Sequence, residues 1–261
     1  MSYRITVGQI KVTPIKLFKA MRLLYRKFFS KKYSEAASFI IAERLAALTY
    51  KGYFFSAYPK AWMKDYAFLK QYKTLVGGDN YHCADRKFFL KNLLNSVVNV
   101  PGNLAECGVF NGASAWFICD FFKNANKLFF GFDSFEGLSQ PKTMDGDFLT
   151  ENLFSANASV ATSRLADFHF ATLHQGWIPN VFDDITKDLF CFVHMDTDLY
   201  QPTLDSLRFF YPLMAKGGII LEDDYGHLHC PGVRIAFDEF LKDKPEKLVE
   251  VPTGQAFFIK H

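Results

Sequence analysis

The 261-residue sequence has few cysteines and no CxxC pair. Its five cysteines are an odd number, which argues against a disulfide framework and against a zinc site built from paired thiolates. No apolar run reaches about 18 residues, so a membrane-spanning helix is not expected. The N-terminal segment also lacks the apolar stretch and cleavage site of a signal peptide. These absences lead us to expect a protein of the reducing cytoplasm.

Acidic residues are missing from the first 34 positions, which carry nine lysines and arginines. The rest of the chain has 21 basic and 27 acidic residues, so the basic character is local. In residues 16–32, five apolar side chains are spaced for one helical face: Leu17, Met21, Leu24, Phe28 and Phe29. We favour packing of this helix on its own protein or on a partner subunit, and contact with an anionic membrane is the alternative. Nucleic acid binding is not expected, because the patch is short and no binding module follows it.

The chain changes character near Pro101. Before it, helical periodicity dominates, in segments near 34–50, 59–74 and 84–97. After it, short apolar runs alternate with helical stretches, which is typical of a parallel sheet covered by helices on both faces. We therefore predict an α/β protein with a helical N-terminal extension, residues 1–100, and a main domain, residues 101–261.

The apolar runs predict strands at 103–107, 128–133, 168–173, 189–195 and 217–222. The stretches between and after them predict helices near 113–123, 154–166, 201–215 and 232–242. Residues 248–261 indicate a hairpin that turns about Pro252-Thr253-Gly254, and residues 136–153 indicate a long loop. In a sheet of this kind a ligand lies beyond the carboxyl ends of the strands, so the residues after each strand are the functional candidates.

A glycine-containing turn follows the first predicted strand and opens a helix, in the segment Glu106-Cys-Gly108-Val-Phe-Asn111-Gly112-Ala-Ser114. The two glycines let the backbone approach a small polar ligand, and free helix N–H groups face that ligand. A plain tight turn explains the glycines equally well. Glu106 favours S-adenosylmethionine over a dinucleotide, because a carboxylate suits an amino group or hydroxyls better than a pyrophosphate.

Two further segments extend this candidate cofactor site. Asp133 ends the second predicted strand and is followed by Ser134, and an acid at this position can accept hydrogen bonds from both ribose hydroxyls. Gly176 and Trp177 follow the third strand, where a ring could bracket the adenine. The alternatives are an aspartate that caps a turn and a buried tryptophan in a loop.

Carboxylates gather after the last two predicted parallel strands. One strand runs into Asp196 and Asp198, and alternation places His194 on the same side if the strand continues that far. The next strand ends in three consecutive acids, Glu222, Asp223 and Asp224.

If these two strands are neighbours, at least three carboxylates converge, and a cation or a shared proton must relieve their repulsion. Oxygen ligands favour Mg²⁺, Mn²⁺ or Ca²⁺ over zinc, and we expect Mg²⁺. The alternative is a solvated acidic turn with a helix cap.

Together these motifs resemble the macrocin O-methyltransferase family, which includes sugar methyltransferases of the mycinamicin and novobiocin pathways. The resemblance spans about residues 75–260. Several ordered motifs at compatible spacing are more specific than any one of them. The matching segments are 105–109 with Gly112 and Ser114, 131–138, 176–177, 196–200, 211–212, 217–218, 222–226 and 231–234.

The resemblance implies a class I S-adenosylmethionine-dependent methyltransferase, with a Rossmann-like seven-stranded sheet, a helical N-terminal extension and a dimeric assembly. It implies that Asp196, Asp223 and Asp224 bind Mg²⁺, with Asp196 also near the cofactor. Asp198 is then the candidate base and His194 the reserve. The implied reaction is methylation of a sugar hydroxyl beside a second oxygen, on a glycosylated natural product, with the loop 139–153 over the acceptor. Because the resemblance fades in this loop and in the basic N-terminal segment, a polysaccharide or glycolipid acceptor stays open.

Three other functions remain open at this stage. A catechol or other phenolic diol presents two adjacent oxygens to a metal just as a sugar does. A metal-dependent phosphohydrolase would use the acidic cluster but would leave Glu106 and Asp133 without a task. A non-catalytic scaffold would use the basic helix as its contact surface and would show no metal-dependent turnover.

Overall fold

The structure, a computed structural model, describes residues 14–30, 34–49, 61–76, 83–185 and 188–261. Parts of three predicted helical segments, residues 31–32, 50 and 59–60, lie outside the described residues. No helix among the described residues is long and apolar enough to cross a membrane.

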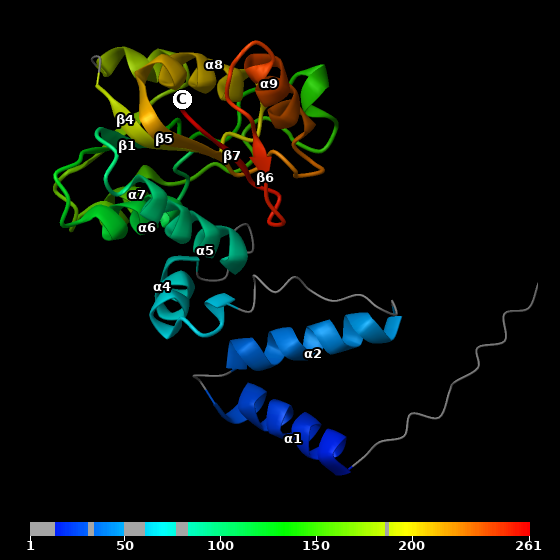
Figure 1. The fold of residues 1–261 in the computed structure, drawn as a ribbon. Helices are drawn as coiled ribbons and strands as arrows, with labels where there is room; N and C mark the ends of the chain where they lie inside the picture. The colour runs from blue at the N-terminus through cyan, green and yellow to red at the C-terminus, as the bar shows by residue number, and fades with distance from the viewer. Residues whose placement is uncertain (1–13, 31–33, 50–60, 77–82, 186–187) are drawn as a thin grey trace, which may run out of the picture. The chain divides into compact units, whose positions relative to one another are not determined.

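The chain divides into two compact units, residues 1–71 and 72–261. The first unit contains α1 (Pro14–Phe29) and α2 (Ser34–Thr49), which pack on each other, as Figure 1 shows. Helix α4 (Tyr66–Val76) crosses the boundary between the units. The second unit also contains α5 (Ala84–Leu93) and the short 3₁₀ helix that follows it, both of which the sequence assigned to the N-terminal extension.

The second unit is built on one seven-stranded sheet, in the order β3-β2-β1-β4-β5-β7-β6. The first five strands are parallel, whereas β7 runs antiparallel to β5 and β6 antiparallel to β7. This confirms the predicted α/β sheet and its C-terminal hairpin. The strands are β1 (Asn103–Cys107), β2 (Phe129–Asp133), β3 (Ala171–Gln175), β4 (Phe190–Met195), β5 (Met214–Glu222), β6 (Val249–Glu250) and β7 (Ala256–Ile259).

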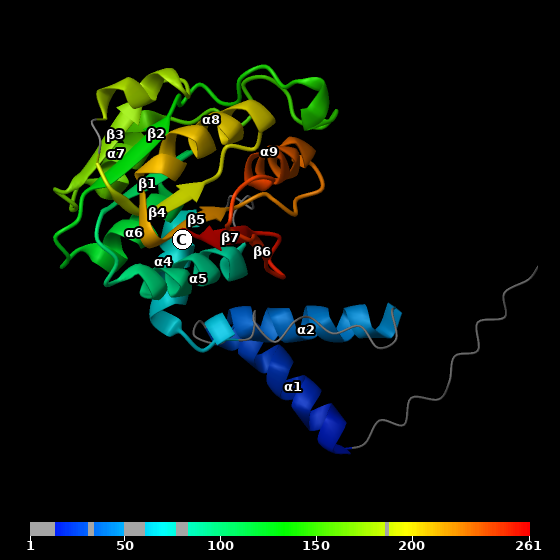
Figure 2. The ribbon, with the colours of Figure 1, turned by 45° about the horizontal axis from the view of Figure 1, so that its top comes forward.

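Helices cover both faces of this sheet, as the two views agree in showing (Figures 1 and 2). Helices α5, α6 (Ala113–Phe122) and α7 (Ala158–Leu165) lie on one face. Helices α8 (Tyr200–Phe210) and α9 (Pro231–Leu241) lie on the other and pack against each other. Because β4 is enclosed between these layers, all six of its side chains are buried, as its unbroken apolar run predicts.

Several predicted elements differ from those in the structure. Helix α7 begins at Ala158 and not at 154, and β5 begins at Met214 and not at 217. The helix predicted near 201–215 ends at Phe210, because Tyr211–Leu213 forms a 3₁₀ turn around Pro212 and the chain enters β5 at Met214. The third strand begins at Ala171, three residues later than predicted, because Phe168 is used in a turn that accepts a hydrogen bond from the Ala171 N–H.

The strand order brings the carboxyl ends of β1 and β4 together at the centre of the sheet. From this point the chain winds toward β2 and β3 in one direction and toward β5 in the other. Such a reversal of strand order is where open α/β sheets form their ligand crevice.

Candidate active site

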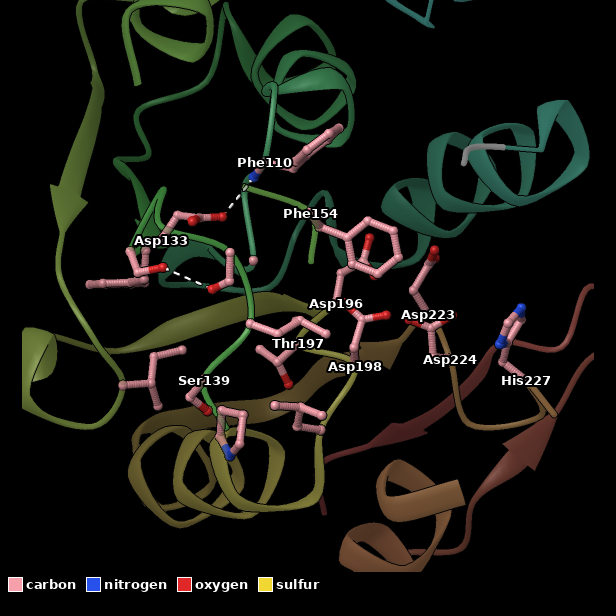
Figure 3. A pocket seen from close by; sticks show the side chains of 18 of the residues that line it. Phe110, Asp133, Ser139, Phe154, Asp196, Thr197, Asp198, Asp223, Asp224 and His227 are labelled. Carbon is pink, nitrogen blue, oxygen red and sulfur yellow. Dashed lines mark hydrogen bonds between the residues drawn. The ribbon is translucent and has the colours of Figure 1, made fainter. Parts of the chain in front are cut away.

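A cavity of about 570 Å³ lies beyond the carboxyl ends of the parallel strands. Loops after all five parallel strands line it, together with residues near the start of α5 and Thr253 of the C-terminal hairpin. Figure 3 shows Asp133 on one side and the four aspartates after β4 and β5 on the other. A cavity of this size can hold a small-molecule ligand.

The glycine turn after β1 joins two strand ends closely. Gly108 has φ +84°, and a Cβ atom there would lie 1.9 Å from the carbonyl oxygen of Asp196. The Gly108 N–H donates to the carbonyl of Phe132, and the Asp196 N–H donates to that of Cys107, each at 2.9 Å. Gly108 therefore allows β1 and β4 to meet, and it also lines the cavity.

Asp133 lines the cavity with its carboxylate held by the backbone. Its Oδ2 accepts from the N–H of Phe110 at 2.7 Å, and its Oδ1 accepts from the N–H of Phe135 at 2.6 Å. Burial raises the pKa of Asp133, although these two hydrogen bonds oppose the shift. Each oxygen has a second lone pair, so the oriented carboxylate can still accept hydrogen bonds from two ligand hydroxyls.

The structure brings six of the nine predicted cofactor residues to the cavity wall: Gly108, Asp133, Ser134, Gly176, Trp177 and Asp196. Three do not line it. Glu106 is fully buried and its Oε1 lies 2.7 Å from His194 Nδ1. Ser114 accepts a hydrogen bond from the ammonium group of Lys87, and the carbonyl of Asn111 accepts one from Arg164.

Three carboxylates converge at the cavity floor. Asp196, Asp198 and Asp224 each place one oxygen within 4.8 Å of the others. Burial and the negative charges of neighbouring aspartates raise the pKa values of Asp196 and Asp198 well above the usual range. Three oxygen ligands so close together, with Asp224 alone in an ion pair, fit a hard divalent cation such as Mg²⁺.

Asp223 has a different environment, although it also lines the cavity. Its Oδ2 lies 3.1 Å from Arg86, and its Oδ1 accepts from the side-chain amide of Gln255 and lies 3.3 Å from His194 Nε2. Burial alone would raise the pKa of Asp223, but the charges of Lys87, Arg86 and His194 hold it well below the usual range. The protein itself therefore compensates the charge of this carboxylate.

Arg86 connects α5 to the acidic cluster. The same guanidinium nitrogen that contacts Asp223 also donates to Asp224 at 3.0 Å, and its Nε donates to the carbonyl of Thr253 at 3.2 Å. Arg86 thus occupies one side of Asp224 and ties the C-terminal hairpin to the site.

His194, the reserve candidate for the base, is fully buried and does not line the cavity. It lies between Glu106 and Asp223, with one ring nitrogen toward each. Burial lowers the pKa of His194, but the hydrogen bonds with these two acids outweigh it and raise the value to about 9. Enclosed between these acids and away from the cavity, the imidazole is placed to orient them and not to take a proton from a ligand.

The sequence profile that matches residues 83–258 describes the Macrocin-O-methyltransferase (TylF) family. The chain belongs to the macrocin O-methyltransferase family. This confirms the resemblance drawn from the ordered motifs.

Two curated relatives illustrate the similarity. Demethyldecarbamoylnovobiocin O-methyltransferase of Streptomyces niveus is 28% identical over 159 residues, 54% of this chain and 59% of that protein. Mycinamicin III 3''-O-methyltransferase of Micromonospora griseorubida is 28% identical over 160 residues, 54% of this chain and 61% of that protein. The chain therefore spans about three fifths of the length of these relatives.

The solved structure of the O-methyltransferase NovP superposes on this chain with a TM-score of 0.59 at 20% identity. The superposition covers 75% of this chain and 98% of the NovP chain. The predicted class I methyltransferase fold is thereby confirmed.

The sequence did not point to three polar residues of the site: Arg86, Lys87 and Gln255. Arg86 and Lys87 stand side by side on a helix, where charged side chains are ordinarily solvated. The excess of buried acids was a signal that cations had to be near, because buried charges are paired. It did not indicate which of the 30 lysines and arginines would supply them.

Proposed function

We propose that this protein is an S-adenosylmethionine- and Mg²⁺-dependent O-methyltransferase that methylates a sugar hydroxyl. The observation that supports this most directly is that one cavity joins the oriented carboxylate of Asp133 to the cluster of Asp196, Asp198 and Asp224. The first suits a ribose and the second suits a metal. A metal-dependent phosphohydrolase would need only the second.

The acceptor is inferred from the family. The two relatives described above are named as O-methyltransferases, one of demethyldecarbamoylnovobiocin and one of mycinamicin III at its 3'' position. We propose a glycosylated natural product, polysaccharide or glycolipid that presents a vicinal diol. A catechol or other phenolic diol is the rival acceptor.

Each side of the cavity has its own task in this proposal. Asp133 accepts from the ribose hydroxyls, and Trp177 with Gly176 lies against the adenine. When bound, S-adenosylmethionine supplies an electrophilic methyl group, and Mg²⁺ lowers the pKa of the acceptor hydroxyl. Asp198 would take the proton of that hydroxyl, and the cavity walls would hold its oxygen close to the methyl group.

Asp196 and Asp224 hold the metal in this proposal. The third carboxylate is Asp223 according to the family resemblance, whereas proximity favours Asp198. Waters and the acceptor diol would supply the remaining oxygen ligands.

Helix α1 provides the partner surface. Six large apolar side chains on it are about half to three-quarters exposed: Phe18, Met21, Leu24, Tyr25, Phe28 and Phe29. An apolar surface of this kind indicates an interaction site. We propose that it joins two copies of the chain as a homodimer, with peripheral membrane contact as the alternative, and that the protein acts in the cytoplasm, where its five free cysteines stay reduced.

The proposal is tested by following transfer of a labelled methyl group from S-adenosylmethionine to a panel of sugar diols, matched monohydroxy sugars and catechols. We expect labelling of a sugar diol that stops on chelation of Mg²⁺ and is restored by adding it back. Asp196→Asn should abolish turnover while cofactor binding persists. If only catechols are labelled, the acceptor is a phenolic diol. If the protein does not bind S-adenosylmethionine but releases phosphate from phosphate esters, it is a hydrolase.

A further inference from the structure

The loop between β5 and α9 carries metal-binding donors that the proposed reaction does not use. Its sequence is Tyr225-Gly-His227-Leu-His229-Cys230, and Cys230 directly precedes α9. The Cys230 side chain is buried, whereas His227 is exposed and lines the cavity. Figure 3 shows His227 on the same side of the cavity as Asp224.

Three different donor atoms come together at this loop. One carboxylate oxygen of Asp224, one ring nitrogen of His227 and the sulfur of Cys230 lie within 4.8 Å of one another. The Cys230 Sγ lies 3.4 Å from His227 Nδ1 and 3.7 Å from Asp198 Oδ1. A single S–H proton therefore faces two acceptors and can serve only one of them.

The separations of Cys230 Sγ from His227 Nδ1 and from Asp198 Oδ1 match those in a tetrahedral zinc site. Zinc–sulfur and zinc–nitrogen bonds of about 2.3 and 2.0–2.1 Å, at a tetrahedral angle, place sulfur and nitrogen about 3.6 Å apart. The corresponding sulfur–oxygen separation is about 3.5 Å. The backbone N–H of His229 donates to His227 Nδ1 at 3.4 Å, so this nitrogen carries a lone pair instead of a proton and gives up that long hydrogen bond when it binds an ion.

We propose that Asp224, His227 and Cys230 form a second cation site, selective for a thiophilic divalent ion such as Zn²⁺, at the edge of the cavity. Sulfur and imidazole ligands favour zinc and are poor ligands for Mg²⁺. On binding, Cys230 releases its proton to solvent and the thiolate coordinates the ion. Asp198, or a water, supplies the fourth ligand.

The site shares Asp224 with the proposed magnesium site. An ion held by Cys230 and His227 therefore competes for this carboxylate, and zinc should inhibit methyl transfer at a fixed Mg²⁺ concentration. This consequence rests on the proposed function, whereas the binding of the ion does not.

Cobalt(II) is the probe, because it replaces zinc and absorbs strongly when a thiolate coordinates it. The full chain, freed of metal and supplied with excess Mg²⁺, is titrated with Co²⁺. We expect one equivalent to bind with a thiolate-to-cobalt band and the visible spectrum of a tetrahedral site, and Zn²⁺ to displace it.

Variants separate this site from adventitious binding. Cys230→Ser should remove the thiolate band, and His227→Gln should weaken cobalt binding at least tenfold, with unfolding transitions close to that of the wild type. Cys83→Ser, at an exposed thiol, should keep the band. So should His229→Gln, because the His229 ring stacks on Phe148 at 3.9 Å. Absence of the band in the wild type, or its persistence in Cys230→Ser, would overturn the proposal. Neither result bears on methyl transfer.

Discussion

Asp198 owes its position to a single backbone turn. Alternation along an extended strand was the basis for grouping His194, Asp196 and Asp198, but β4 ends at Met195 and Asp198 has φ +58°. This left-handed turn carries the Asp198 carboxylate to Asp224, while His194 points into the protein between two acids. The sequence indicated that acids gather here, but the role of each depends on backbone geometry that the pattern does not encode.

The roles of Asp198 and Asp223 are separable by paired substitutions. If Asp198 is the base, Asp198→Asn should lower kcat by about 10²–10⁴-fold with little change in the Mg²⁺ concentration for half-maximal activity. Asp223→Asn should instead raise that concentration at least tenfold. Asp196→Asn should weaken direct Mg²⁺ binding, measured by calorimetry, by a similar factor. The opposite pattern would make Asp198 the ligand and Asp223 an orienting group.

His194 makes stability depend on pH. Its pKa is about 9 in the folded protein and about 6.5 when unfolded, so its contribution is complete below pH 6.5 and is lost as pH rises toward 9. One pKa unit corresponds to about 1.4 kcal/mol, which sets an upper limit of about 3.5 kcal/mol.

Chemical denaturation without Mg²⁺, at pH 6.5 and at pH 9, measures this contribution. The difference in unfolding free energy between wild type and His194→Gln should shrink at the higher pH. A difference that stays constant would show that His194 is neutral throughout.

At the scale of elements, the strands and helices of the main sheet follow from their apolar patterns, but the anchoring of the loops does not. The loop predicted at 136–153 is fixed to the domain by Asp145, whose buried carboxylate accepts from the backbone N–H of Tyr200 at 2.6 Å, at the start of α8. The other oxygen of the Asp145 carboxylate accepts from the backbone N–H of Lys142 at 2.7 Å. Local composition predicts a loop, whereas a contact between residues 55 positions apart decides where it lies.

The close approach of Gly108, in the turn between β1 and α6, to the Asp196 backbone can be tested by comparison with a second glycine, Gly217. Gly108 and Gly217 have similar φ values, +84° and +81°, so alanine at either position adopts the same unfavourable backbone conformation. A Cβ at Gly217 would lie 3.6 Å from Val100, an ordinary contact, whereas at Gly108 it would clash with the Asp196 backbone.

We therefore expect Gly108→Ala to destabilise the protein by about 1–3 kcal/mol more than Gly217→Ala, measured by chemical denaturation. Equal effects would mean that the junction of β1 and β4 adjusts freely, and that Gly108 is not needed for their approach.

At the scale of the whole molecule, the sequence predicted a basic amphipathic helix but not what it contacts. Helix α1 packs on α2, yet its large apolar side chains remain exposed. A surface that is both apolar and basic can serve a second protein copy or an anionic bilayer, and sequence patterns of this kind are common to both.

Two sets of substitutions distinguish these partners. In analytical ultracentrifugation, a variant with Gln in place of Met21, Leu24 and Phe28 should be monomeric. A control variant with Gln in place of Lys19, Arg22 and Lys27 should remain dimeric. If the wild type is monomeric and sediments with anionic but not with neutral vesicles, the partner of helix α1 is an anionic membrane and not a second copy of the chain.

The central claim is that the cavity binds S-adenosylmethionine through Asp133. Calorimetric titration of this cofactor and its demethylated product, with and without Mg²⁺, tests it against wild type, Asp133→Asn and the surface control Asp120→Asn. We expect both ligands to bind the wild type and the control, with affinity at least tenfold weaker in Asp133→Asn, a loss of about 1.4 kcal/mol or more. Absence of binding to the folded wild type would contradict the account.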